Sequence, residues 1–270
     1  MEVRRFALRE LLTISPPLQA LLAGLMTWGL TAAGAALVLL MKRPRPATLD
    51  AMLALGAGVM LAASYFSLLA PAIDTALSLG QNPFAMAALG FMAGGLLLMA
   101  SDALLSRCLH GLPFSGERRR TILLIASITL HNIPEGLAIG VAFGAAALSP
   151  QLAALTGAWM LALGVGLQNT PEGAAVSLPL YRDGMRRSRA FFWGQASALV
   201  EPVSALVGAL LALHVQPVLP FALAFAAGAM VSVVIGELVP ESQRSPAASV
   251  MTLFTMMGFT LMMILDVALG

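Results

Sequence analysis

The chain of 270 residues is dominated by long, uninterrupted apolar runs, and these constrain its fold more than any other feature. A helix needs about 20 apolar residues to cross the roughly 30 Å of hydrocarbon in a bilayer. With 59% hydrophobic and 10% charged residues, the composition excludes a soluble domain. We predict an all-α integral membrane protein in which residues 1–270 form a single polytopic domain. Eight transmembrane helices are expected, at 17–41, 49–71, 83–106, 121–147, 152–180, 190–213, 217–239 and 247–268.

The basic residues predict how the chain is oriented in the membrane. Most of the 15 Lys and Arg lie in the connections after the first, third, fifth and seventh predicted helices. Cytoplasmic connections are enriched in these residues, so both termini are expected outside the cytoplasm. We predict a multi-pass protein of the cell (inner) membrane, with the lipid bilayer as partner, no nucleic acid, and a homodimer as one assembly that the sequence allows. The single cysteine, Cys108, excludes a zinc site built from several thiolates.

The fourth predicted helix carries polar residues inside an apolar run. Its sequence from Ser127 to Gly144 is SITLHNIPEGLAIGVAFG, in which His131 and Glu135 are four residues apart and share one helical face. Each ionisable side chain at the bilayer centre costs about 2.5–3.5 kcal/mol, so such residues normally serve a function. Pro134 removes one backbone donor and predicts a kink at this cluster.

The same pattern returns in the fifth predicted helix, where GLQNTPEGAA contains Gln168, Asn169, Pro171 and Glu172. The sixth adds a third buried acid next to a third proline, Glu201 with Pro202. Corresponding helices that are interrupted near their middle point to a binding site at the membrane midplane of a transporter. We therefore predict that the fourth and fifth helices face each other around a site.

The charge balance of this site predicts its ligand. Glu135, Glu172 and Glu201 lie in apolar runs that contain no Lys or Arg. Carboxylates without a countercharge at low dielectric either stay protonated or receive cations. Oxygen and imidazole donors suit a borderline divalent ion such as zinc, or Fe, Mn, Co or Cd. The alternative is three protonated glutamates that only hold helices together.

These residues resemble a known family. HNIPEGLAIG, QNTPEGAAVSLPL and WGQASALVEPVSALVGA are similar to the ZIP family of divalent metal transporters, and QNTPEG followed by FFWGQ resembles its bacterial GufA-type branch. The resemblance implies an inverted repeat of helices 1–3 and 6–8 around the central pair of helices 4 and 5. It also implies an elevator-type movement of helices 1, 4, 5 and 6 against helices 2, 3, 7 and 8, with zinc or another divalent ion as the substrate rather than a cofactor.

The resemblance further implies roles for individual residues. The first metal site would use four residues of helices 4 and 5 together with Met60 of helix 2: His131, Glu135, Gln168 and Glu172. A second site would draw on Asn132, Asn169 and Glu201, with Glu135 and Glu172 as bridges. Asp74 and Asp266 match acids at the outer entrance, and Asp102 and Glu237 match positions near the cytoplasmic exit. From composition alone, Met60 is one of 16 methionines and a packing residue by default.

Two other functions are weighed against metal transport. A membrane metallohydrolase would need the HExxH pattern, in which a glutamate follows the first histidine directly. Asn132 takes that position and the motif has no second histidine, so we do not predict an enzyme. A proton or organic-solute carrier would use the same buried acids without a metal, and the residues alone leave it open.

Overall fold

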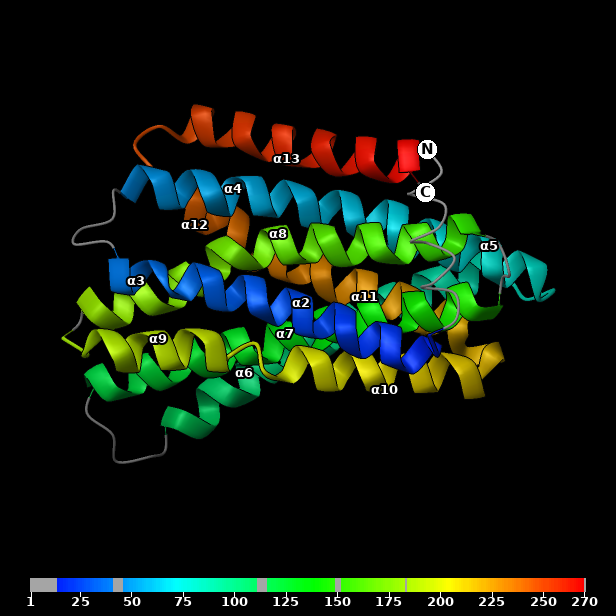
Figure 1. Cartoon of the computed structure of the whole chain (residues 1–270), viewed down its shortest axis with the longest axis horizontal. Coiled ribbons are helices and arrows are strands. Elements are labelled where there is room, and N and C mark those ends of the chain that lie inside the picture. The colour runs from blue at the N-terminus through cyan, green and yellow to red at the C-terminus, as the bar shows by residue number, and fades with distance from the viewer. Residues whose placement is uncertain (1–13, 41–45, 111–115, 149–151, 183, 270) are drawn as a thin grey trace.

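The computed structural model describes residues 14–40, 46–110, 116–148, 152–182 and 184–269, and these residues form a bundle of long helices without a β-strand (Figure 1). The helices run close to the long axis of the molecule, with α13 and α4 on one side of the bundle and α10 on the other (Figure 1). The prediction of an all-α protein is confirmed within the described residues. 

The helices follow one another with short connections, and several begin at a proline. Proline suits the first turn of a helix because its missing N–H would have no partner there. The segments are α2 (Pro16–Ala35), α3 (Leu37–Leu40), α4 (Pro46–Ala63), η1 (Ser64–Leu69), α5 (Ala70–Ser78), α6 (Pro83–His110), α7 (Gly116–Leu148), α8 (Leu152–Arg182), α9 (Arg187–Ala196), α10 (Val200–His214), η2 (Gln216–Val218), α11 (Leu219–Val233), η3 (Val234–Leu238), α12 (Val239–Gln243) and α13 (Ala248–Leu269).

The membrane character of these helices follows from their length and composition. Within the described residues, six helical stretches are long and apolar enough to cross a bilayer: Pro16–Leu40, Ala47–Ser78, Pro83–Leu105, Arg187–His214, Gln216–Gln243 and Ala248–Ala268. α7 and α8, of 33 and 31 residues, are also long enough but carry the polar residues of the candidate site. The chain is a multi-pass membrane protein.

Prolines explain where the helices depart from the predicted ones. The predicted span 190–213 lies within the apolar stretch Arg187–His214, but a short break at 197–199 divides this stretch into α9 and α10. Pro202 lacks an N–H, and its ring would clash with the carbonyl of Ala198 in a continuous α-helix. By contrast, α7 passes through Pro134 and α8 through Pro171 as single helices.

Two segments are π-helical, which the sequence patterns had not predicted. η1 lies between α4 and α5, and η3 lies between α11 and α12. A proline follows the end of each by two residues, Pro71 after η1 and Pro240 after η3. In a continuous α-helix each proline ring would clash with the carbonyl four residues earlier, which is that of Ser67 for Pro71 and that of Gly236 for Pro240. Both of these residues lie inside the wider π-turn. The π-turn therefore accommodates the proline without ending the helix.

Glycines bring helix backbones into direct contact in three sets of helices: α2, α7, α8 and α10 in one set, α4 and α13 in another, and α6 and α11 in a third. We call the first set, with α9, the α7–α8 body, and the other two sets together, with their π-helical segments, the α4–α11 body. Wherever a Cβ added to a described glycine would come within 3.0 Å of another helix's backbone, both helices belong to the same body. Small residues allow this close packing between membrane helices.

The boundary between the two bodies is made by side chains instead. A Cβ at Gly56 of α4 would lie 3.3 Å from Cγ of Gln168 in α8, and one at Gly164 of α8 would lie 2.6 Å from Sδ of Met262 in α13. α4 and α8 still pack extensively along this boundary. At these two glycines the bodies thus meet through flexible side chains, whereas the close backbone-to-backbone contacts lie within the bodies.

The close glycine contacts predict a difference between two positions of α2. A methyl group at Gly34 would overlap the carbonyl oxygen of Thr170, whereas one at Gly29 would meet no atom within 4 Å. Overpacking of this kind costs about 1–3 kcal/mol. We expect Gly34→Ala to lower the melting temperature of the purified protein in detergent, and Gly29→Ala to leave it unchanged or raise it. Equal melting temperatures for both variants would contradict this packing.

Candidate metal site

α7 and α8 bring the predicted polar residues together in the interior of the bundle. His131, Asn132 and Glu135 of α7 and Gln168, Asn169 and Glu172 of α8 are all buried, none more than 8% exposed. Glu201 in the first turn of α10 is fully buried beside them. The seven polar residues singled out from the sequence therefore share one buried region.

The side-chain amides in this region act as hydrogen-bond donors. Nε2 of Gln168 donates to Oε2 of Glu172 at 2.7 Å, and Nδ2 of Asn169 donates to Oε1 of Glu201 at 2.9 Å. Nδ2 of Asn132 donates to the carbonyl of Ser197 at 3.1 Å. That carbonyl is available because the helix breaks between α9 and α10. Each amide is thereby oriented with its NH₂ group engaged.

The oxygens of the same region are left without donors. Six buried oxygen atoms have no hydrogen-bond partner among the described residues: Asn132 Oδ1, Glu135 Oε1, Glu135 Oε2, Gln168 Oε1, Asn169 Oδ1 and Glu201 Oε2. A buried acceptor without a donor costs about 1–3 kcal/mol, and a charged one costs more. A native structure rarely leaves several such acceptors together, and a bound ion is one recognised reason for it. The arrangement is therefore chemically suited to a cation.

Charge gives the same indication. Glu135, Glu172 and Glu201 lie close enough to interact electrostatically with one another. No Lys or Arg is buried among the residues whose burial the structure describes. The hydroxyls of Thr27 and Thr31 lie near Glu201 but are also within hydrogen-bond distance of backbone carbonyls of α2. Neutral groups and one histidine thus surround three carboxylates.

His131 has a charged neighbour from the other body. Its Nε2 lies 3.1 Å from Oε1 of Glu237 in η3, and the Glu237 side chain is 43% exposed. Glu237 was predicted as an acid near the cytoplasmic exit, and the structure places it directly against the predicted site. This contact was not predicted from the sequence, because the π-turn that positions Glu237 was not predicted.

Met60 stands at the edge of this region. It is 1% exposed in α4, within the main apolar core. Gly56, one turn earlier on the same face, contacts Gln168.

Among the described residues, no three His, Cys, Asp or Glu side chains form a group close enough to hold a metal ion.

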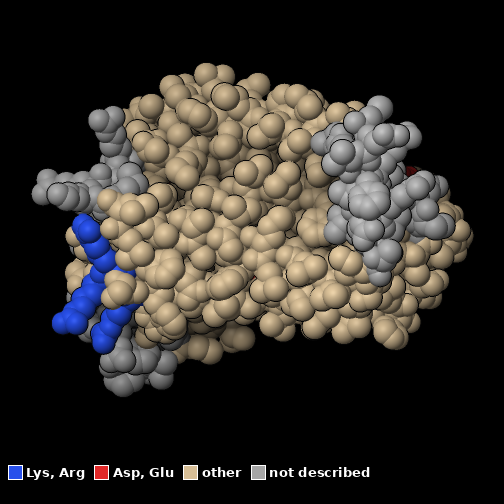
Figure 2. Space-filling view, in the orientation of Figure 1, with Lys and Arg blue, Asp and Glu red and all other residues tan. Residues whose placement is uncertain are grey.

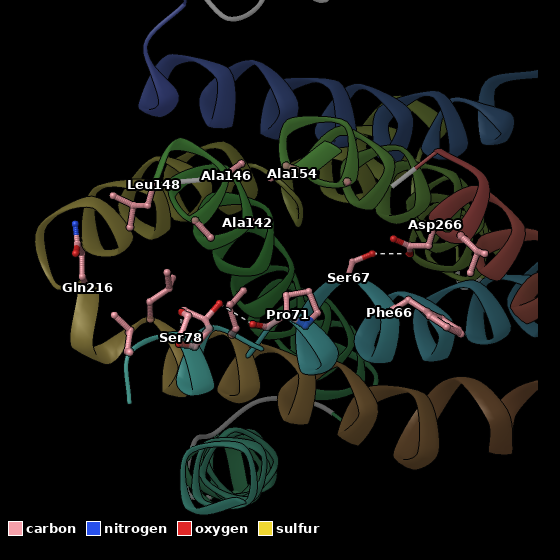
Figure 3. A pocket seen from close by; sticks show the side chains of 18 residues that line it. Phe66, Ser67, Pro71, Ser78, Ala142, Ala146, Leu148, Ala154, Gln216 and Asp266 are labelled. Carbon is pink, nitrogen blue, oxygen red and sulfur yellow. Dashed lines mark hydrogen bonds between the residues drawn. The ribbon is translucent and has the colours of Figure 1, made fainter. Parts of the chain in front are cut away.

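The two acids predicted at the outer entrance lie in different surroundings. Asp266 of α13 lines a pocket of about 580 Å³ together with residues of η1, α5, α7, α8 and α11 (Figure 3). Oγ of Ser67 in η1 donates to Oδ2 of Asp266 at 2.7 Å (Figure 3). Asp74 is exposed on α5 and does not line this pocket. Asp102 belongs to α6, but its side chain lies outside the described residues.

Comparison with known proteins identifies the family. The family described as "ZIP Zinc transporter" matches residues 110–266, more than half of the chain. The chain belongs to the ZIP family. Its similarity extends to zinc transporter ZIPB of Bordetella bronchiseptica, 40% identical over 93% of this chain and 81% of that protein. GufA of Myxococcus xanthus is 37% identical over 76% of this chain and 81% of that protein, which places the chain in the GufA-type branch. Zinc transporter ZIP11 of Xenopus tropicalis is 38% identical over 95% of this chain and 98% of that protein.

The unpartnered oxygens of Glu135 predict an effect on stability. Folding this ZIP protein without a cation places the Glu135 carboxyl in a site that offers neither of its oxygens a donor. Glu135→Gln removes the charge and supplies a donor for neighbouring oxygens. We expect it to raise the melting temperature in the presence of a chelator, by the equivalent of about 1 kcal/mol or more.

The control for this measurement is Glu241→Gln. Glu241 is exposed and pairs with Arg244, so its loss should change stability by about 0.5 kcal/mol at most. A chelator-treated Glu135→Gln protein that melts at or below the wild-type temperature would show that the carboxyl group is well accommodated without a cation.

Proposed function

We propose that this protein carries divalent transition-metal ions across the cell membrane into the cytoplasm, with zinc as the main substrate and Cd, Fe, Mn and Co as further substrates. The observation that carries the proposal is the group of six buried acceptor oxygens beside three carboxylates with no buried Lys or Arg. The naming of ZIPB, GufA and ZIP11 as zinc transporters supports zinc in particular.

The proposed ion site lies between α7 and α8. His131, Glu135, Gln168 and Glu172 are its main ligands, and Met60 of α4 completes it from the other body. Imidazole and oxygen donors with one thioether suit a borderline ion. Asn132, Asn169 and Glu201 form a neighbouring second position, with Glu135 and Glu172 between the two. The burial of all eight residues supports this assignment.

The proposed path enters at the pocket that Asp266 lines, with Asp74 exposed nearby on α5, and leaves past Glu237, with Asp102 further along. The charge distribution supports the orientation. Arg187 and Arg189 of α9 follow Arg186 at one end of the bundle, and the Lys and Arg visible in Figure 2 gather at that end. By the positive-inside rule this end faces the cytoplasm, so both termini are extracytoplasmic in an inner-membrane protein.

The proposed movement is an elevator-type sliding of the α7–α8 body against the α4–α11 body. Backbone contacts through glycine resist relative movement, because close-packed backbones cannot pass without separating. Such contacts occur inside the bodies, while across the boundary the atom nearest to a Cβ added at Gly56 or Gly164 belongs to a side chain. The division corresponds to helices 1, 4, 5 and 6 against 2, 3, 7 and 8.

We also propose eight transmembrane helices in one domain, with helices 1–3 and 6–8 as an inverted repeat. α7 and α8 would be the two further spans, in addition to the six apolar stretches described above. The paired π-turns support the repeat. η1 lies just past the middle of the second span, Ala47–Ser78, and η3 lies in the second half of the seventh, Gln216–Gln243, each ending two residues before a proline. Because these spans run in opposite directions, the two turns lie towards opposite ends of the molecule.

The transport proposal is tested with purified protein in liposomes that contain a zinc- and cadmium-sensitive dye. Glu172→Gln and His131→Ala should abolish ion entry, since each removes a main ligand, while both proteins remain folded. Glu241→Gln, an exposed acid outside the site, should keep the wild-type rate. Normal ion entry in Glu172→Gln would rule out the proposed site.

The sliding proposal is tested by cross-linking. In a Cys108→Ser background, we expect a disulfide between Gly164→Cys and Met262→Cys to stop ion entry, because it joins the two bodies, and reduction with a phosphine to restore it. The control is Ser177→Cys with Gly194→Cys, whose Cβ positions are 3.0 Å apart within the α7–α8 body. Equal transport with and without the Gly164–Met262 cross-link would contradict relative movement at this boundary.

A further inference from the structure

We infer that Glu237 competes with the cation for Nε2 of His131. When no cation is bound, Glu237 accepts a hydrogen bond from Nε2 and so links the two bodies, and an arriving ion takes its place at this nitrogen. The inference rests on the proposed function and concerns the regulation of the same site. The observation behind it is the 3.1 Å contact between Nε2 of His131 and Oε1 of Glu237.

The contact crosses the boundary between the bodies. His131 lies in α7, and Glu237 lies in η3, which continues α11 of the other body. The Glu241–Arg244 pair, by contrast, is made within one segment and its loop. Sliding of one body past the other must therefore break or remake this contact.

The π-turn accounts for the position of Glu237. One extra residue in a helical turn rotates the residues that follow it by about 100° relative to a continuous α-helix. Pro240 makes the wide turn favourable, and Gly236 leaves open space where a side chain would stand. Helix geometry, rather than a flexible loop, thus directs this acid towards the buried histidine.

The hydrogen bond and a metal bond exclude each other at Nε2. A carboxylate only accepts hydrogen bonds, so Nε2 must carry the hydrogen when it contacts Glu237. A metal binds the lone pair of an imidazole nitrogen that has no hydrogen. Binding of a cation through Nε2 therefore requires the hydrogen bond to Glu237 to break. The exposed half of Glu237 gives it access to water when this bond breaks.

A different arrangement would give the opposite result. If the cation bound Nδ1 of His131, Glu237 would instead hold the ring in place from behind. Carboxylates that support a ligating histidine in this way raise metal affinity, and their loss typically lowers it by about 10- to 100-fold. If Glu237 instead competes with the cation for Nε2, its removal should raise the metal affinity. The sign of the change separates the two arrangements.

The experiment measures Cd²⁺ binding to purified wild-type, Glu237→Gln, Glu237→Ala and Glu237→Asp proteins by titration calorimetry. Loss of this half-exposed contact should tighten binding by about two- to fivefold. The Ala variant should change at least as much as Gln, because a glutamine oxygen can still accept from His131. The Asp variant keeps the charge but withdraws it from Nε2, so the affinity should change in the same direction.

The second readout is the maximal rate of zinc entry into liposomes, which we expect to fall in the Glu237 variants because the displacing group is lost. Glu241→Gln, a neighbouring exposed acid, is the matched control and should match the wild type in both measurements. Unchanged or weaker Cd²⁺ binding in the Glu237 variants would overturn this inference but would not affect the proposal that the protein transports metal ions. A wild-type protein that neither binds Cd²⁺ nor admits zinc would instead overturn the proposed function.

Discussion

The desolvation of three carboxylates in an apolar bundle is the constraint on which the rest of this structure depends. Glu135, Glu172 and Glu201 are buried together, and no Lys or Arg is buried among the residues of described burial. The neighbouring amides offset part of this cost by donating to Glu172 and Glu201. Glu135 receives no such donor. The polar region is therefore incompletely satisfied by the protein itself, which is the state that a cation site needs.

Proline residues shape the backbone around this region in three different ways. Pro202 interrupts a helix and exposes the carbonyl of Ser197, which then orients Asn132. Pro71 and Pro240 each follow a π-turn, and these turns direct Ser67 to Asp266 and Glu237 to His131. Pro134 and Pro171, next to the site acids, are contained within continuous helices. Irregular backbone is thus found where it positions polar groups, as expected for a membrane protein in which lipid cannot satisfy free backbone groups.

Much of the fold could be predicted from the sequence because apolar length is a strong signal in a membrane protein. The predicted span 83–106 corresponds to α6 and 152–180 to α8, with similar limits. The burial of His131, Glu172 and Glu201 also followed from their places in apolar runs. What the sequence could not supply were effects of geometry between helices. The contact of Glu237 with His131 depends on a π-turn, and periodicity arguments that assume 3.6 residues per turn place Glu237 elsewhere.

The division into two bodies gives the buried site a particular character. In the proposed ion site most residues belong to the α7–α8 body, but Met60 and Glu237 would come from the α4–α11 body. Any relative movement of the bodies would then change the set of groups around the ion, even if α7 and α8 stay rigid. Binding energy at such a site depends on the position of the bodies, and by linkage the ion biases that position in return. A site built wholly within one body would lack this coupling, so its placement across a boundary of side chains connects the chemistry of the carboxylates to movement of the helices.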